Sequence, residues 1–89
     1  MKVEKIIEAG IKKFNKYRKP EAIAELLEFR ENEFSVKMSG TFCLTCGFYD
    51  YFEDLRLFLE ECGLKTEIKE IREIENGAII KFKIVKIVR

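Results

Sequence analysis

The chain has 89 residues, of which 47% are hydrophobic and 37% charged, and its 17 Lys and Arg against 16 Asp and Glu leave a net charge of +1. A chain of this length builds one hydrophobic core, so we expect a single domain over residues 1–89 and exclude a second one. The balanced charge excludes a strong whole-molecule field toward nucleic acid. No apolar run approaches the ~20 residues that cross a bilayer, which excludes a membrane-spanning helix.

Location and source are also constrained by composition. The segment Met1–Lys5 carries alternating charges where a signal peptide needs an apolar stretch, so we expect a cytoplasmic protein. The chain is rich in Lys, Glu and Ile and has no Gln, His or Trp, a composition that suits heat-adapted proteins. The three cysteines are then expected as thiols or metal ligands, although disulfides stay open because heat-adapted intracellular proteins form them.

The first 27 residues predict two helices. Apolar residues recur every three or four positions from Val3 to Tyr17, which indicates an amphipathic helix. Gly10 lies inside this helix, and we expect a close approach by another backbone or ring to explain it. Pro20 suits a first helical turn, and a second apolar stripe follows it. The residues of that stripe are Ala22, Ile23, Leu26 and Leu27.

The middle of the chain predicts a strand and then a helix. Residues 33–39 alternate polar and apolar side chains, which is typical of a half-buried strand ended by Gly40. Asp50 precedes Glu53 by three residues, which predicts a capping box at the start of the helix, and Gly63 is expected as its left-handed stop. The apolar stripe of this helix consists of Phe52, Leu55, Phe58, Leu59 and Cys62.

The last segment predicts a long β-hairpin turning at Asn76-Gly77. Counting outward from that turn pairs Ile74 with Ile79, Ile71 with Phe82 and Ile68 with Val85. These pairs step by three, which requires either bulges or a sheet that is apolar on both faces. Seven of the ten residues 79–88 are apolar, and they fall at both odd and even positions, so the second explanation is favoured. The apolar face that the helices would leave uncovered predicts a homo-oligomer, most simply a homodimer.

We therefore predict an α+β fold with the order helix, helix, strand, helix, strand, strand. Its sheet is small and mostly antiparallel, with a long C-terminal β-hairpin packed by helices. The alternative to an oligomer is that the N-terminal helices cover one face of the sheet and the third helix covers the other.

Cys43 and Cys46 form a CxxC on the connection from strand to helix, and this spacing suits one metal ion or a strained disulfide. A structural zinc site needs four ligands, and the chain has no second CxxC and no His. Zinc binding would therefore require Cys62 and Asp50 as further ligands, or one CxxC from each of two subunits.

The strand, CxxC, helix order over residues 34–62 resembles the active-site element of thioredoxin-like proteins, which implies thiol–disulfide exchange with a thiol activated by the helix N-terminus. The chain departs from that family in three ways. Phe42 stands where Trp is common, no later proline could face the thiols, and no helix follows the last strand. The remaining interpretation is that the cysteines pack as small hydrophobic residues, and Cys62 suits it best because it ends an apolar stripe.

The absence of His removes the usual nucleophile activation, and no phosphate-binding glycine loop is present, so neither an ordinary hydrolase nor a nucleotide-binding protein is expected. A non-catalytic protein is favoured, and catalysis of another kind stays open. A basic run on the first helix predicts nucleic-acid binding as a further alternative. Its residues are Lys12, Lys13, Lys16, Arg18 and Lys19. The leading hypothesis is a homo-oligomeric binding or structural module with the CxxC loop as its candidate site. The alternative is a thiol-based metal or redox protein, and no small-molecule ligand can be named.

Overall fold

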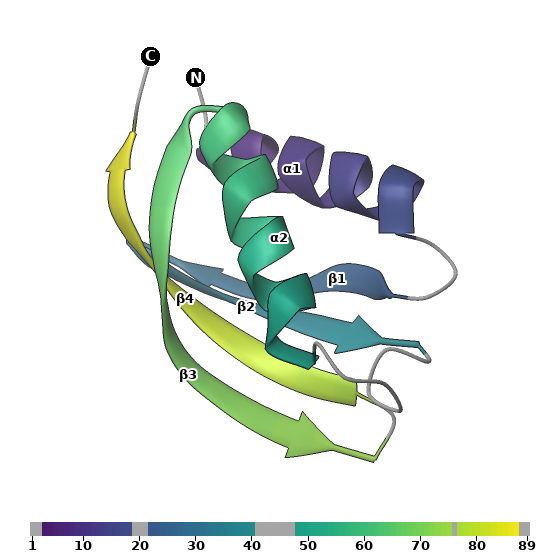
Figure 1. The fold of residues 1–89 in the computed structure, drawn as a ribbon. Helices are drawn as coiled ribbons and strands as arrows, with labels where there is room; N and C mark the ends of the chain where they lie inside the picture. The colour runs from purple at the N-terminus through teal and green to yellow at the C-terminus, as the bar shows by residue number, and fades with distance from the viewer. Residues whose placement is uncertain (1–2, 19–21, 41–47, 76, 88–89) are drawn as a thin grey trace.

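In a computed structural model, residues 3–18, 22–40, 48–75 and 77–87 are described, and the statements below concern these residues. The four strands form one antiparallel sheet in the order β1-β2-β4-β3, and both helices lie on the same face of it (Figure 1). The elements are α1 (Val3–Arg18), β1 (Ile23–Arg30), β2 (Glu33–Ser39), α2 (Phe48–Glu61), β3 (Leu64–Ile74) and β4 (Gly77–Ile87). The α+β class, the small antiparallel sheet and the long C-terminal hairpin packed by helices are confirmed. Neither described helix is long and apolar enough to cross a membrane.

Helix α1 follows the prediction closely. Its apolar stripe, which includes Ile7 and Phe14, is buried against the sheet and against α2. A β-carbon built on Gly10 would lie 2.6 Å from Cδ2 of Leu59 and 3.3 Å from its Cα. The expected close approach at Gly10 is therefore confirmed, and the neighbour is α2.

The predicted second helix is wrong, because residues 23–30 form strand β1. Ala22 and Ala24 are buried, while Ile23 and Leu27 are exposed, which is the alternation of a strand. The register with β2 shifts between Leu26 and Glu28. This bulge gives the apolar residues a mixed spacing that resembles a helical stripe. Pro20, on which the helical interpretation also rested, lies outside the described residues.

Strand β2 is confirmed with its predicted bounds and faces. Phe34, Val36 and Met38 are buried on the side that carries the helices. The Phe34 and Phe82 rings, on neighbouring strands β2 and β4, stack with centroids 5.1 Å apart and an interplanar angle of 16°. These side chains form the centre of the core between sheet and helices.

Helix α2 begins at Phe48, two residues before Asp50. Asp50 therefore lies in the first turn of the helix, and its predicted role as the capping residue is wrong. The predicted stripe is otherwise correct, since Phe52, Leu55 and Leu59 are fully buried. Gly63 has φ 102°, which confirms it as the left-handed stop.

The C-terminal hairpin is confirmed, but its predicted turn and register are wrong. Ile74 pairs with Gly77, so Gly77 belongs to the paired strands and not to the turn, and Asn76 lies outside the described residues. Ile71 pairs with Ile80, and Ile68 pairs with Phe82. Gly77 is not among the described glycines with positive φ. It is needed because β2 is so close that a β-carbon would lie 1.9 Å from the Met38 carbonyl oxygen.

The face away from the helices is mostly charged and carries a few apolar side chains, such as Ile23 and Leu27, so the prediction of a sheet that is apolar on both sides is wrong for the described residues. Lys69 is an extra residue between Ile68 and Glu70, and this bulge lets Ile68 and Ile71 lie on the same, helix-covered face. Both helices pack on that face, so the idea that α2 covers the opposite one is also wrong (Figure 1). One row across the outer face reads Arg30, Glu33, Lys83 and Glu67, with charges that alternate in sign.

An ion pair between Lys69 and Glu33 crosses β4 on this outer face. The hydrogen bond from Lys69, helped by the charges of Lys81 and Lys83, holds the pKa of Glu33 below its usual 4.5. Because the folded pKa is lowered, the pair stabilises the fold above pH 4.5, and this contribution is lost as the pH falls through the lowered value.

We expect Glu33→Gln to have a lower urea midpoint than the wild type near neutral pH, and the difference to vanish in acid. Glu75→Gln, at an exposed turn position, is the control and should show no such convergence. A midpoint difference for Glu33→Gln that is the same at every pH would contradict the assignment.

Candidate binding surface on the helical layer

The predicted thiol pair, Cys43 and Cys46, lies outside the described residues. The structure describes the elements on either side of this segment. Strand β2 ends at Ser39, followed by Gly40 with φ 128°, and helix α2 begins at Phe48. Along the sequence, Cys46 therefore precedes the first residue of a helix by two positions.

The two further ligands considered for a metal, Asp50 and Cys62, lie at opposite ends of α2. The two residues are twelve positions apart along the helix and the residue after it, which is ~18 Å at 1.5 Å per residue, so one ion cannot contact both in the same chain. Asp50 is exposed, whereas Cys62 is a half-buried free thiol packed against the core. Within the described ranges, no group of three or more His, Cys, Asp and Glu could hold a metal ion.

The basic run on α1 is partly neutralised by acidic residues of α2. Lys13 Nζ lies 2.9 Å from Glu61 Oε1, and this hydrogen bond and charge raise the pKa of Lys13. Arg18 forms an ion pair with Asp54. Lys12 and Lys16 are exposed and make no ion pair with any described residue. Lys19 lies outside the described residues.

The helical layer as a whole is divided by charge. Helix α1 has five Lys and Arg against two Glu, a net charge of +3. Helix α2 has five Asp and Glu against one Arg, a net charge of −4. The two helices pack against each other on one face of the sheet (Figure 1). A basic helix and an acidic helix therefore cross each other in one layer (Figure 1).

An exposed aromatic group lies at the seam between the two helices. Tyr17 is 61% exposed, and its ring stacks on that of Phe58 with centroids 5.8 Å apart and an interplanar angle of 2°. Nζ of Lys16 lies 5.9 Å from the Tyr17 ring centroid. Leu57, the neighbour of Phe58 on α2, is 49% exposed.

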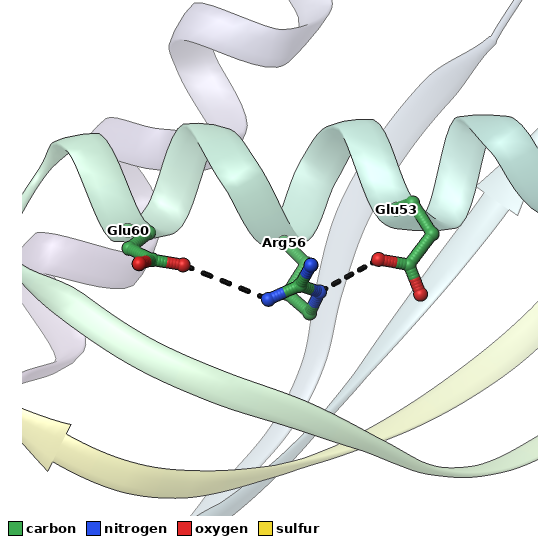
Figure 2. Close-up of polar contacts among 3 residues, drawn as sticks. All are labelled: Glu53, Arg56 and Glu60. Atoms are coloured by element: carbon green, nitrogen blue, oxygen red, sulfur yellow. Dashed lines mark hydrogen bonds and ion pairs between the residues drawn. The ribbon is translucent and has the colours of Figure 1, made fainter.

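An ion-paired triad fixes the acidic side chains along α2. Arg56 Nε lies 2.7 Å from Glu53 Oε1, and its Nη1 lies 3.6 Å from Glu60 Oε1. Figure 2 shows Arg56 between the two carboxylates on the same side of the helix. Exposed pairs of this kind add little to stability, but they hold the carboxylates in place.

Sequence reasoning missed this surface. The α1 stripe was expected to bury Tyr17 with the other apolar residues, whereas the structure leaves most of it exposed. The signal that could have found it is the contrast in charge between residues 12–18 and residues 50–61. Comparison with family models, curated proteins and solved structures found no match, so the argument for function uses the chain's own residues.

Proposed function

We propose that this protein is a homo-oligomeric module that works by binding, and that its helical layer is the docking surface. The observation that supports this most directly is Tyr17, an aromatic residue that is 61% exposed between a basic and an acidic helix. Tyrosine is enriched at protein interfaces because its ring buries a large apolar area while its hydroxyl can still form a hydrogen bond.

The sheet supports the choice of the helical layer as docking surface. Its outer face carries alternating charges, and its two edge strands, β1 and β3, each contain a bulge. Bulges and charges on edge strands are how proteins prevent edge-to-edge pairing. The strands also expose aliphatic side chains, such as Leu27 and Val85, but the exposed aromatic side chains among the described residues, Tyr17 and Tyr49, are on the helices.

Native mass spectrometry of freshly purified protein, with and without reductant, tests this proposal because one spectrum reports subunit number, bound metal and disulfide mass. We expect a dimer without metal whose mass does not depend on reductant. A monomer at all concentrations would contradict the homo-oligomer. A metal that leaves on acidification would support a thiolate site instead.

The second candidate function is thiol chemistry at Cys43 and Cys46. It is favoured by the start of α2 at Phe48, because a helix N-terminus stabilises a nearby thiolate. Asp50 in the first turn acts in the opposite direction. If this function holds, one of the two thiols should be alkylated by iodoacetamide at a pH well below the usual ~8.5 for cysteine. Half-buried Cys62 is the internal control. Slow alkylation of all three thiols would exclude an activated thiol.

Nucleic-acid binding by α1 is a third proposal, supported by Lys12 and Lys16, which have no described ion-pair partner, and by the position of Lys16 beside the Tyr17 ring. Basic side chains with an exposed aromatic ring are typical of single-strand binding surfaces. Retention on a heparin column that falls steeply with salt and is reduced in Lys12→Glu/Lys16→Glu would support it.

A further inference from the structure

We infer that Asn15 closes the edge of β1 against pairing with a second copy of this chain. This inference goes beyond the proposed docking surface on the helical layer, because it concerns the backbone of the sheet. β1 is an edge strand, since it stands first in the order β1-β2-β4-β3. An edge strand presents backbone N–H and C=O groups with which another extended chain can pair.

The side chain of Asn15 binds the backbone of β1, which lies beside α1 (Figure 1). Its Oδ1 accepts a hydrogen bond from the Ala24 N–H at 2.7 Å, and its Nδ2 donates one to the Ala24 carbonyl oxygen at 3.0 Å. Two residues of neighbouring antiparallel strands exchange the same two bonds in a hydrogen-bonded pair. The Asn15 amide therefore takes the place that a residue of a fifth strand would have.

These bonds show which backbone groups of β1 point out of the sheet. Ala24 is in register with β2, but its N–H and C=O bind Asn15 on the other side. The bonding groups of a strand alternate in direction from one residue to the next, so those of Leu26 point outward as well. Two residues before Ala24, the Ala22 N–H donates to the Arg18 carbonyl oxygen at 3.1 Å. The end of α1 thus binds the chain at both Ala22 and Ala24.

The stretch that Asn15 covers is the part of this edge best suited to pairing. The register with β2 is regular from Ile23 to Leu26 and shifts after it. Four of the five residues from Ile23 to Leu27 are apolar, and Ile23 and Leu27 are exposed. A regular, apolar edge favours association, whereas a bulge disrupts pairing. The bulge therefore protects the second half of the edge, and Asn15 protects the first.

A second copy fits the opened edge in a self-complementary register. A two-fold axis at Ala24 would pair this residue with Ala24 of the second copy, and the two would exchange the bonds that Asn15 makes in the single chain. In this register Ile23 lies opposite Glu25 of the second copy, so the two Glu25 carboxylates do not face each other. The Asn15 side chain must leave the edge before this pairing can form.

Asn15→Ala opens the edge and leaves the sequence of the sheet unchanged. Alanine favours a helix more than asparagine does, so α1 should stay folded, which circular dichroism checks. We expect the Ala24 amide to exchange with solvent about tenfold faster or more, relative to the amides of the central strand β2. Sedimentation velocity should show larger assemblies than the wild type forms. Glu8→Ala, at an exposed position of α1 that makes neither bond, is the matched control and should change nothing.

Two further variants identify the cause. Lysine on an edge strand prevents pairing, so Ile23→Lys in the Asn15→Ala background should restore the wild-type assembly while the Ala24 amide stays fast. Asn15→Asp keeps an oxygen that accepts from the Ala24 N–H. It should therefore keep that amide slow and the assembly unchanged, and it tests the contact even if Asn15→Ala does not fold.

Fast exchange at Ala24, together with larger assemblies that disappear on Ile23→Lys, supports the inference. A slow Ala24 amide in Asn15→Ala, or assemblies equal to those of the wild type, would overturn it. Larger assemblies that persist with Ile23→Lys would overturn it too, because pairing at this edge would not be their cause. In Asn15→Asp, an Ala24 amide as fast as that of Leu26 would exclude the contact. Each comparison is made with the wild type, so no outcome depends on how the helical layer binds.

Discussion

Gly77→Ala is expected to lower the free energy of unfolding by about 3 kcal/mol or more, because its new β-carbon would overlap backbone atoms of the neighbouring strand β2. That carbon would lie 1.9 Å from the Met38 carbonyl oxygen and 2.9 Å from Cα of Ser39. Backbone in a central strand pair cannot move aside as a flexible side chain can. Strand β4 would have to separate from β2 over the residues that pair next to the turn, Met38 with Ala78 and Ser39 with Gly77.

Urea unfolding of Gly77→Ala, Gly77→Asn and Glu75→Ala distinguishes close approach from turn conformation. If Gly77 were required for positive φ, asparagine would be tolerated much better than alanine. Since the requirement is steric, both substitutions should be equally damaging or asparagine should be worse. Glu75 is exposed in the turn, and its substitution should change stability by less than about 0.5 kcal/mol. A stable Gly77→Asn would contradict the steric explanation.

The elements that could be predicted from the sequence are those with an uninterrupted period. Strand β2 alternates over seven residues, and α1 repeats its apolar residues over four turns. In each case, every apolar side chain has the same direction as its neighbour one period away. For β2, the predicted and observed bounds are therefore identical.

The elements that could not be predicted contain bulges. A bulge changes the spacing of the apolar residues along a strand, and no sequence motif shows where it occurs. In β1, the shift between Leu26 and Glu28 produces a mixed spacing that was taken for a helix. In β3, the extra residue Lys69 separates Ile68 and Ile71 by three positions and keeps them on one face. Counting pairs from the turn assumes a regular ladder and therefore failed here.

The candidate surface could be predicted only in part. The basic residues of α1 were visible in the sequence, but their neighbours depend on how α1 packs against α2. Gly10 allows the two helices to approach closely. Lys13 and Arg18 then form ion pairs with Glu61 and Asp54 of α2, which is distant in the sequence. The exposure of Tyr17 follows from the same packing, because Phe58 covers only one part of its ring.

Leu59→Ala is expected to destabilise the fold by about 3 kcal/mol, within the range of 2–5 kcal/mol for large-to-small substitutions in cores. Leu59 is fully buried where α1 crosses α2. The glycine opposite cannot fill the space that the substitution creates, so the loss should lie toward the upper part of that range. Leu57→Ala, on the exposed side of the same helix, is the control and should cost far less. Thermal unfolding followed by circular dichroism measures both.

The same contact predicts that the residue at position 59 determines whether Gly10→Ala raises or lowers the free energy of unfolding. In the wild type, the added β-carbon would lie 2.6 Å from Leu59 Cδ2 and 3.3 Å from its Cα, so overpacking of about 1–3 kcal/mol should exceed the ~1 kcal/mol that alanine gains over glycine within a helix. In the Leu59→Ala background, Cδ2 is gone and only the milder approach to Cα remains. Gly10→Ala should then be neutral or stabilising, which gives a coupling free energy of about 1–3 kcal/mol in a double-mutant cycle. Additive effects of the two substitutions would show that the helices do not approach each other at these two residues.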